Sequence, residues 1–394
     1  MPEGRHIILS QDFFPAVGGA HHWLYEVYSR WPEQVIALVA DYSSQPIFAE
    51  RQNAFDQSDH GSLSITRHSH VFEDLDLLSL PFYIKNRKIH KLISQHSSPK
   101  AMTLHCLRAY PEGFVAALYK RLHGNTPHLV TYAHGEEVVT AQTSRQLAWM
   151  AKFAYKASDC IITNSKSTEN LVNSFCGHPN IHIIHPGVDF GSFAFTETEV
   201  SEQRQQWGFS DDDIVLIAIS RMEPRKNHAR VLNSVAELRS LGLPVVSVMA
   251  SDGEEKPALQ GLAHDLGITE YVRFPGYIDD RERVVSFAAA DMHVQPSIQS
   301  GSMIEGYGIV FIEAAAAGIP SIAGNIGGQA EAVLDGTTGL VIDGTDQKQL
   351  TEAIKRLSAS PELRQQMGGA GRSWARKNDW NQIAEQTELL LKHI

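Results

Sequence analysis

Several features are scarce in this chain. Its 394 residues include three cysteines, Cys106, Cys160 and Cys176, and no C-x-x-C pair. A small, odd number of cysteines argues against a disulfide-rich secreted domain, so we expect a reducing compartment such as the cytoplasm. No apolar stretch approaches the roughly 18 residues that a membrane-spanning helix needs. The apolar run at residues 7–9 is too short for the apolar region of a signal peptide.

Signatures of several other protein classes are missing. The 19 histidines form no H-E-x-x-H motif and no Cys/His spacing typical of zinc, and His68 and His70 have no third ligand nearby in the sequence. There is no G-x-S-x-G nucleophile elbow, and the first predicted strand is not followed by the G-x-G-x-x-G dinucleotide fingerprint. The net charge of −11 argues against general nucleic-acid binding, which requires a basic face.

The sequence does contain a repeated alternation of short apolar runs and helical patterns. Strands are expected at residues 7–10, 35–39, 62–66, 102–106, 128–132, 160–165 and 181–184, and then at 214–220, 245–249, 272–276, 293–297, 321–323 and 340–342. Strands separated by helices predict parallel sheets with helices on both faces. The length allows two or three domains, and the turn at Pro186-Gly187 suggests a domain junction.

One stretch carries the strongest functional signal. Residues 305–313 read Glu-Gly-Tyr-Gly-Ile-Val-Phe-Ile-Glu, and the alanines that follow, ended by Gly318 and Pro320, predict a helix with its stop signal. The glycines before the first turn leave its backbone N–H groups open to an anion, phosphate above all. Glu305 and Glu313 could then reach hydroxyl groups on either side of that phosphate. A buried helix with two incidental glutamates would give the same spacing.

Polar residues follow three other predicted strands. The pair Gly18-Gly19 forms a turn after the first strand, and His134 follows the strand at 128–132, at the edge where open α/β sheets bind ligands. Arg221 and Lys226 follow the strand at 214–220, where cations can neutralise a diphosphate. Taken singly, each of these could be an ordinary loop residue.

The stretch 305–313 resembles the E-x7-E motif of the retaining glycosyltransferases of family four. Their GT-B fold has two Rossmann-like domains that face each other across a cleft. The resemblance covers nearly the whole chain. It implies an acceptor-side domain at residues 1–188, a nucleotide-sugar-binding domain at 189–377, and a C-terminal helix at 378–394 that packs back on the first domain.

The resemblance also implies an activity. A hexose would move from GDP-mannose or a UDP-hexose to a hydroxyl of a glycan, a glycolipid or a small molecule, with retention and without a metal or other cofactor. Glu305, His134, Arg221 and Lys226 would be catalytic. The donor-binding residues would be Gly18, Gly19, Arg221, Lys226, Tyr277, Ile278, Glu305, Tyr307, Gly308, Ile309, Val310 and Glu313. Within this set Glu313 would hold the ribose, Glu305 would contact the sugar, and Arg221 and Lys226 would neutralise the diphosphate.

Some alternatives stay open at this point. The same fold could serve a catalytically silent nucleotide-sugar-binding scaffold or a sugar-nucleotide epimerase. Asp74-Leu75-Asp76 and Asp211-Asp212-Asp213 match the D-x-D metal signature of the other large glycosyltransferase fold, although we expect solvated turns. The basic segment 84–93, with Ile84, Ile89, Leu92 and Ile93, could form an amphipathic helix and bring a cytoplasmic protein to the inner face of a membrane.

Overall fold

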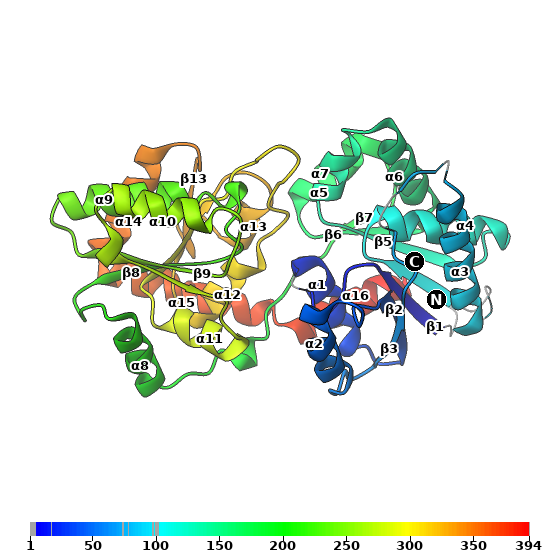
Figure 1. The fold of residues 1–394 in the computed structure, drawn as a ribbon, viewed down its shortest axis with the longest axis horizontal. Coiled ribbons are helices and arrows are strands. Elements are labelled where there is room, and N and C mark those ends of the chain that lie inside the picture. The colour runs from blue at the N-terminus through cyan, green and yellow to red at the C-terminus, as the bar shows by residue number, and fades with distance from the viewer. Residues whose placement is uncertain are drawn as a thin grey trace. The chain divides into compact units, whose positions relative to one another are not determined.

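The computed structural model of the protein describes residues 5–16, 18–72, 75–77, 79–96, 98 and 102–393. It divides into two compact units, one formed by Met1–Pro186 together with Trp380–Ile394, the other by Gly187–Asp379. Each unit is built around one parallel sheet with helices on both faces (Figure 1). The predicted α/β class, with two parallel sheets, is confirmed.

The first unit holds a seven-stranded sheet in the order β3-β2-β1-β4-β5-β6-β7, with neighbouring strands parallel. Its strands are β1 (Arg5–Ser10), β2 (Val35–Ala40), β3 (Leu63–His68), β4 (Met102–Cys106), β5 (His128–Ala133), β6 (Cys160–Thr163) and β7 (Ile181–Ile183). Every residue of β2 is buried. A continuous apolar run of this kind is expected where helices cover both faces of a sheet.

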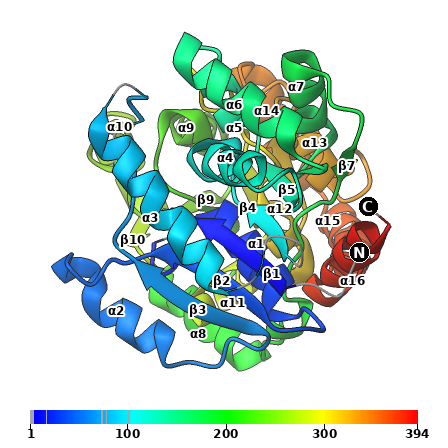
Figure 2. The ribbon, with the colours of Figure 1, turned by 90° about the vertical axis from the view of Figure 1, so that its right-hand side faces the viewer.

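The helices of this unit come from both ends of the chain. They are α1 (Gly19–Ser29), α2 (Pro46–Asp56), α3 (Leu80–His96), α4 (Phe114–Leu122), α5 (Glu136–Ala141), α6 (Arg145–Ala157), α7 (Lys166–Cys176) and α16 (Trp380–Lys392), with a π-helical turn η2 (Ala109–Gly113). Helix α16 packs beside α1, where the rings of Trp380 and His22 are 5.8 Å apart (Figure 1). Helix α3 lies alongside α4, and the His90 imidazole donates to the Val115 carbonyl at 3.0 Å (Figure 2).

The second unit holds a six-stranded sheet in the order β10-β9-β8-β11-β12-β13, again parallel. Its strands are β8 (Ile214–Ile219), β9 (Val245–Ala250), β10 (Val272–Gly276), β11 (Met292–Gln295), β12 (Ser321–Gly324) and β13 (Gly339–Ile342). Its helices are η3 (Phe190–Ser192), α8 (Glu197–Trp207), η4 (Pro224–Lys226), α9 (His228–Ser240), α10 (Lys256–Asp265), η5 (Thr269–Tyr271), α11 (Asp280–Ala288), α12 (Ile309–Ala317), α13 (Gln329–Ala332), α14 (Gln347–Ser358) and α15 (Pro361–Lys377).

Two apolar layers hold the second sheet between its helices. Side chains of α9, α10 and α14 form one layer with Leu216 and Val294, and side chains of α8, α11 and α12 form the other with Val215 and Ile217. In Figure 1, α9, α10 and α14 lie above this sheet, and α11, α12 and α15 lie below it. Alternate residues of a strand point to opposite faces, which explains how one strand supplies both layers.

The strand order reverses once in each sheet. In the first sheet the reversal lies between β1 and β4, and in the second it lies between β8 and β11. Chains leave the two strands at such a point in opposite directions, which opens a crevice at their carboxyl ends where ligands bind in α/β folds. The loops after β1, β4, β8 and β11 are therefore the positions at which to look for functional side chains.

The helices that the structure describes include none that is both long enough and apolar enough to cross a membrane.

Candidate active site

The predicted helix of the E-x7-E stretch is α12, and its start is shaped by glycine. Gly308 precedes the helix with a φ of +88°, and a Cβ placed there would lie 2.6 Å from the Phe311 ring. A side chain at position 308 would therefore be strained and would also collide with the helix it caps. The first backbone N–H groups of α12, beginning at Ile309, have no carbonyl one full turn earlier in the helix, although that of Phe311 donates to the Gly308 carbonyl at 3.0 Å. A helix start of this kind attracts anions, which is the role that the sequence predicts for it.

An ion-pair cluster lies at the reversal point of the second sheet. Lys226 follows β8, Glu305 lies in the loop after β11, and both side chains are buried. The Lys226 ammonium donates to Glu305 Oε2, and Arg225 donates to the same oxygen at 3.0 Å. The structure thus joins two of the predicted site residues, which are far apart in the sequence, and adds Arg225 as a second cation.

The cluster extends to the surface and carries an excess of positive charge. Glu223 accepts from Arg225 at 3.1 Å and from Arg221 at 3.1 Å, and the side chain of Arg221 is 62% exposed. Three cations share two carboxylates, Glu223 and Glu305, which leaves a net charge of +1 when all are ionised. Arg221 holds no direct contact with Lys226 here; the two are linked through Glu223, Arg225 and Glu305.

Burial and pairing act in opposite directions on the pKa values of the pair. Burial alone would raise the pKa of Glu305, but the charges of Lys226 and Arg225 and their hydrogen bonds outweigh it, so the pKa is lowered. The pKa of Lys226 is also lowered, because its burial outweighs the attraction of Glu305. Glu305 is therefore an ionised carboxylate whose Oε2 is held by two cations, and this pairing lowers its basicity and nucleophilicity.

A glutamine clamp holds the loops around Glu305. Gln329 opens α13 and is fully buried. Its side-chain oxygen accepts from the backbone N–H groups of Ser297 at 3.1 Å and Gly324 at 3.0 Å, and its amide donates to the carbonyls of Ser297 at 3.0 Å and Ile326 at 2.7 Å. All four hydrogen bonds that the side chain can readily make are filled, so the strand ends of β11 and β12 are tied together.

The glycine loop before Gln329 contacts Glu305 directly. The Gly328 N–H donates to the Glu305 carbonyl at 2.9 Å. Gly327 has a φ of +74°, and a Cβ there would lie only 2.1 Å from that carbonyl oxygen. We infer that this loop fixes the backbone of Glu305, while the ion pairs with Lys226 and Arg225 fix its side chain.

The remaining donor-side residues lie around the same sheet edge with different exposure. Glu313, in the second turn of α12, forms an ion pair with Arg283 at 3.4 Å. Tyr307 is buried, with burial raising the pKa of its hydroxyl. Tyr277 is 59% exposed and Ile278 is half-buried, both in the loop between β10 and α11.

Three predicted residues belong to the first unit. Gly18 is extended and caps α1, which begins at Gly19. His134 is half-buried at the end of β5; its Nε2 donates to the Leu107 carbonyl at 2.8 Å, which leaves Nδ1 as an acceptor in the neutral ring. Burial, helped by the charge of Arg108, lowers the pKa of His134 to about 3. At neutral pH this imidazole is uncharged.

The two D-x-D segments are the possible metal sites that the sequence offers. Asp213 accepts from the Ser210 N–H at 2.8 Å and pairs with Arg239 at 3.4 Å, which gives it a local structural role. Asp74, of the other D-x-D segment, lies outside the described residues. Across the part of the chain that the structure describes, no group of three or more His, Cys, Asp or Glu side chains is placed to hold a metal ion.

Two family models together match most of the chain. The model described as "Glycosyltransferase Family 4" matches residues 17–191, and the model described as "Glycosyl transferases group 1" matches residues 199–374. The chain belongs to the family-four GT-B glycosyltransferases. Each model falls almost wholly within one of the two structural units, so this glycosyltransferase combines the two halves typical of that fold.

Individual relatives are distant but similar in length. A "GDP-mannose-dependent alpha-(1-6)-phosphatidylinositol monomannoside mannosyltransferase" of Mycolicibacterium smegmatis is 27% identical over 378 residues, 94% of this chain and 94% of the relative. Its Mycobacterium tuberculosis counterpart is 27% identical over 98% of both chains. The solved structure of Anabaena HepE in complex with UDP and glucose aligns with a TM-score of 0.81 at 18% identity, covering 99% of this chain and 100% of that one. At this identity the structural likeness shows the fold.

Proposed function

We propose that this glycosyltransferase moves a hexose from a nucleoside diphosphate to an acceptor hydroxyl, with retention of anomeric configuration and without a divalent metal. The observation that carries the proposal is the cationic cluster of Arg221, Arg225 and Lys226 beside Glu305 and the start of α12. Bond cleavage puts negative charge on the departing diphosphate. Preorganised cations and backbone N–H groups stabilise such charge without reorganising during the reaction.

The state of Glu305 supports a particular form of retention. A double-displacement mechanism needs a carboxylate free to attack the sugar, whereas Glu305 Oε2 already accepts from two cations. We therefore assign Glu305 to holding Lys226 in place and to contacting the sugar, and we assign retention to attack on the same face from which the diphosphate leaves. Glu313, in the second turn of α12, is assigned to the ribose hydroxyls.

For the donor, GDP-mannose is our first candidate, because the relatives that span 94–98% of this chain are named as GDP-mannose-dependent. A thermal-shift panel of GDP, GDP-mannose, UDP, UDP-glucose and UDP-galactose tests this. A ligand at a hundredfold excess over its dissociation constant stabilises the folded state by about 2.7 kcal/mol. If no nucleoside diphosphate raises the melting temperature, the proposal fails.

Metal independence and retention have separate tests. Transfer should persist in excess EDTA, and loss that Mn²⁺ restores would contradict the cation-only account. The anomeric configuration of the product, read by NMR from its one-bond C–H coupling, should match that of the donor. An inverted product would exclude the assigned mechanism. Incubation with donor alone should give neither epimerised sugar nor rapid hydrolysis.

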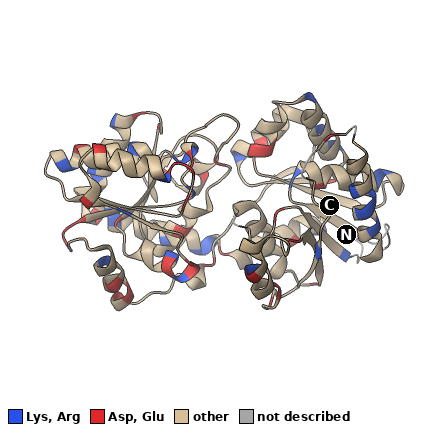
Figure 3. Ribbon diagram, viewed as in Figure 1, with Lys and Arg blue, Asp and Glu red and all other residues tan. Residues whose placement is uncertain are grey.

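We also propose that α3 brings the enzyme to an anionic membrane surface, where a lipid-linked acceptor would be met. Leu80, Tyr83 and Ile84 are 70%, 57% and 46% exposed at the start of the helix, and basic residues follow along it (Figure 3). Exposed apolar residues next to cations are typical of helices that lie on anionic lipid.

Fewer apolar residues of the basic segment 84–93 are available to a membrane than the sequence suggests. Ile89 and Ile93 are buried in the core of the first unit, so they are not available to lipid. The basic residues on the exposed side are Arg87, Lys88 and Lys91. Binding to vesicles that contain phosphatidylserine should fall when Lys88 and Lys91 are changed to Glu, and should be unaffected by Lys348→Glu, an exposed change in the second unit. Equal binding of both variants would refute this surface.

A further inference from the structure

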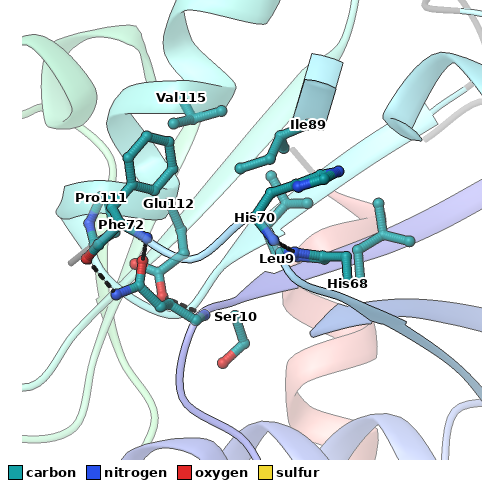
Figure 4. Close-up of a pocket in the computed structure, with 11 residues that line it drawn as sticks. Leu9, Ser10, His68, His70, Phe72, Ile89, Pro111, Glu112 and Val115 are labelled. Atoms are coloured by element: carbon teal, nitrogen blue, oxygen red, sulfur yellow. Dashed lines mark hydrogen bonds between the residues drawn. The ribbon is translucent and has the colours of Figure 1, made fainter. Parts of the chain in front are cut away.

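A second polar site lies in the first unit, at the reversal point between β1 and β4. A small cavity of about 20 Å³ opens there, lined by residues of β1, β2 and β3, by residues that follow β1, β3 and β4, and by side chains of α3 and α4 (Figure 4). A volume of this size holds one water-sized group. The lining residues are Leu9, Ser10, Gln11, Leu38, His68, His70, Phe72, Ile89, Pro111, Glu112 and Val115.

Glu112 brings an unused acceptor to this cavity. It lies in the π-helical turn η2 after β4, and the residue is 6% exposed. Its Oε1 accepts from the Gln11 N–H at 2.7 Å, which joins the ends of β1 and β4 and fixes the carboxyl group. Its Oε2 is buried, and no hydrogen-bond donor among the described residues reaches it. A buried carboxyl oxygen without a partner is costly, and a ligand or water that donates to it removes the cost.

The loop opposite Glu112 is itself held in place. The Gln11 side chain exchanges two hydrogen bonds with the Phe72 backbone, at 2.8 and 2.9 Å. The His68 Nδ1 accepts from the His70 N–H at 3.2 Å, so the neutral His68 ring carries its proton on Nε2. Burial, followed by the nearby His70, lowers the pKa of His68 to about 4, and the ring is uncharged at neutral pH. The lining thus includes a carboxyl group with an unpaired oxygen and a neutral imidazole ring.

The chemistry of the lining selects the ligand. Ser10 is a further polar lining residue, and the rest of the cavity wall is apolar: Leu9, Leu38, Phe72, Ile89, Pro111 and Val115. A phosphate is too large and would face a carboxyl group. An ammonium would need more than one acceptor once removed from water. A hydroxyl group donates one hydrogen bond and accepts another, and the carbon that bears it can contact the apolar wall.

We propose that this cavity binds a hydroxyl or hydroxymethyl group of a sugar or polyol acceptor, with Glu112 Oε2 as the hydrogen-bond acceptor. The inference rests on the proposed transferase function and narrows its acceptor to neutral, hydroxyl-rich molecules at this position.

The test is ligand-observed saturation-transfer NMR on the full chain without nucleotide. The probes are methyl α-D-mannopyranoside, methyl α-D-glucopyranoside and myo-inositol, each at millimolar concentration. At least one probe should receive saturation from the wild-type protein. Glu112→Leu should weaken its binding by about tenfold or more, because a hydrogen bond to a charged group is lost. Glu112→Gln keeps an amide oxygen at the position and should retain binding.

Two further variants keep the result interpretable. Ile89→Phe leaves Glu112 intact but fills the cavity, and it should also abolish binding; it decides the question if Glu112→Leu does not fold. Glu33→Leu, the same change as Glu112→Leu but at an exposed loop residue, should bind as the wild type does. Binding by no probe, or equal binding by wild type, Glu112→Leu and Ile89→Phe, would overturn the proposal.

The outcome also separates this inference from the proposed function. Nucleotide stabilisation without saturation transfer to any probe keeps the transferase proposal and overturns the acceptor cavity. Saturation transfer that depends on Glu112, with no stabilisation by any nucleoside diphosphate, refutes the transferase proposal and with it the acceptor role of the cavity.

Discussion

Removing the negative charge of Glu305 should destabilise the second unit, and should do so more strongly than removing Lys226. In Glu305→Gln, the buried Lys226 loses its ion-pair partner, while Arg225 keeps Glu223. In Lys226→Met, Glu305 still pairs with Arg225. Breaking a buried pair by deleting one partner costs about 3–5 kcal/mol when the other charge is left alone. We expect Glu305→Gln to approach that range and Lys226→Met to cost clearly less.

The pH dependence gives this prediction a second, independent readout. The folded-state pKa of Lys226 is already below its usual value because of burial, and losing Glu305 should lower it further. A lysine with a lowered folded-state pKa costs stability while it is protonated, and that cost fades as the pH rises through the folded-state pKa. The stability deficit of Glu305→Gln relative to the wild type should therefore shrink as the pH rises from 7 towards the ordinary lysine pKa of about 10.4.

Urea unfolding monitored by circular dichroism at several pH values measures both effects. For a unit of this size, each kcal/mol also corresponds to a shift of roughly 2–4 °C in melting temperature. The matched control is Glu254→Gln, at an exposed position, which should change stability by no more than about 0.5 kcal/mol. If Glu305→Gln is as stable as this control, or if its deficit grows with pH, the buried-pair reasoning is refuted.

Three further predictions concern other parts of the molecule. Glu313→Gln should mainly raise the donor KM, whereas Lys226→Ala should lower kcat by an amount equivalent to about 2.7–4 kcal/mol. The opposite result in steady-state kinetics would contradict the roles proposed for Glu313 at the ribose and Lys226 at the diphosphate. Gln329→Leu leaves four backbone groups unpaired and should lower the melting temperature and kcat together, with unchanged kinetics arguing against the clamp. The first unit should lose stability as the pH falls from 6.5 towards 4, because burial lowers the pKa of His6 to about 4 and that of His105 well below its usual value; replacing His105 with Gln should reduce this loss in acid unfolding curves.

Much of the fold could be predicted from the sequence because its signals are local. A buried parallel strand shows as a continuous apolar run, and β8 and β9 were expected on that basis. The start of α12 could also be predicted, because Gly306 and Gly308 stand just before the helical stretch; the structure adds that Gly308 has a positive φ. Where the two strand orders reverse could not be read from the sequence, because it depends on pairing between distant segments.

The details of the site were less accessible for the same reason. The sequence placed Arg221, Arg225 and Lys226 after one strand but did not show which arginine shares the Glu305 oxygen with Lys226; in the structure it is Arg225. Which of two neighbouring arginines turns inward depends on the 3-10 turn η4, which has no clear sequence signature. The role of Gln329 was not anticipated, because its four partners lie in separate loops.

For the basic segment 84–93, the sequence predicted the helix but not the surroundings of its apolar side. Its apolar residues recur at helical spacing, which correctly indicates an amphipathic helix, but the pattern does not say what covers the apolar side. Ile89 and Ile93 pack into the core of the first unit, and only the start of α3 offers apolar side chains to lipid. The spacing of apolar residues identifies the apolar face of a helix, but whether protein or membrane covers that face depends on the packing of the rest of the chain.

The two reversal points show how one topology supports two kinds of recognition. In each sheet a residue after one strand bonds a carboxyl group contributed after the neighbouring strand: Gln11 bonds Glu112 in the first sheet, and Lys226 bonds Glu305 in the second. In the second sheet the carboxylate is outnumbered by cations, and the helix start adds donors, so the edge favours a diphosphate. In the first sheet the carboxyl group faces an apolar wall and keeps one oxygen unpaired, so the edge favours a neutral hydroxyl. If both proposals hold, the second sheet's edge binds the anionic leaving group and the first sheet's edge binds a neutral hydroxyl, which are the two partners of the proposed transfer.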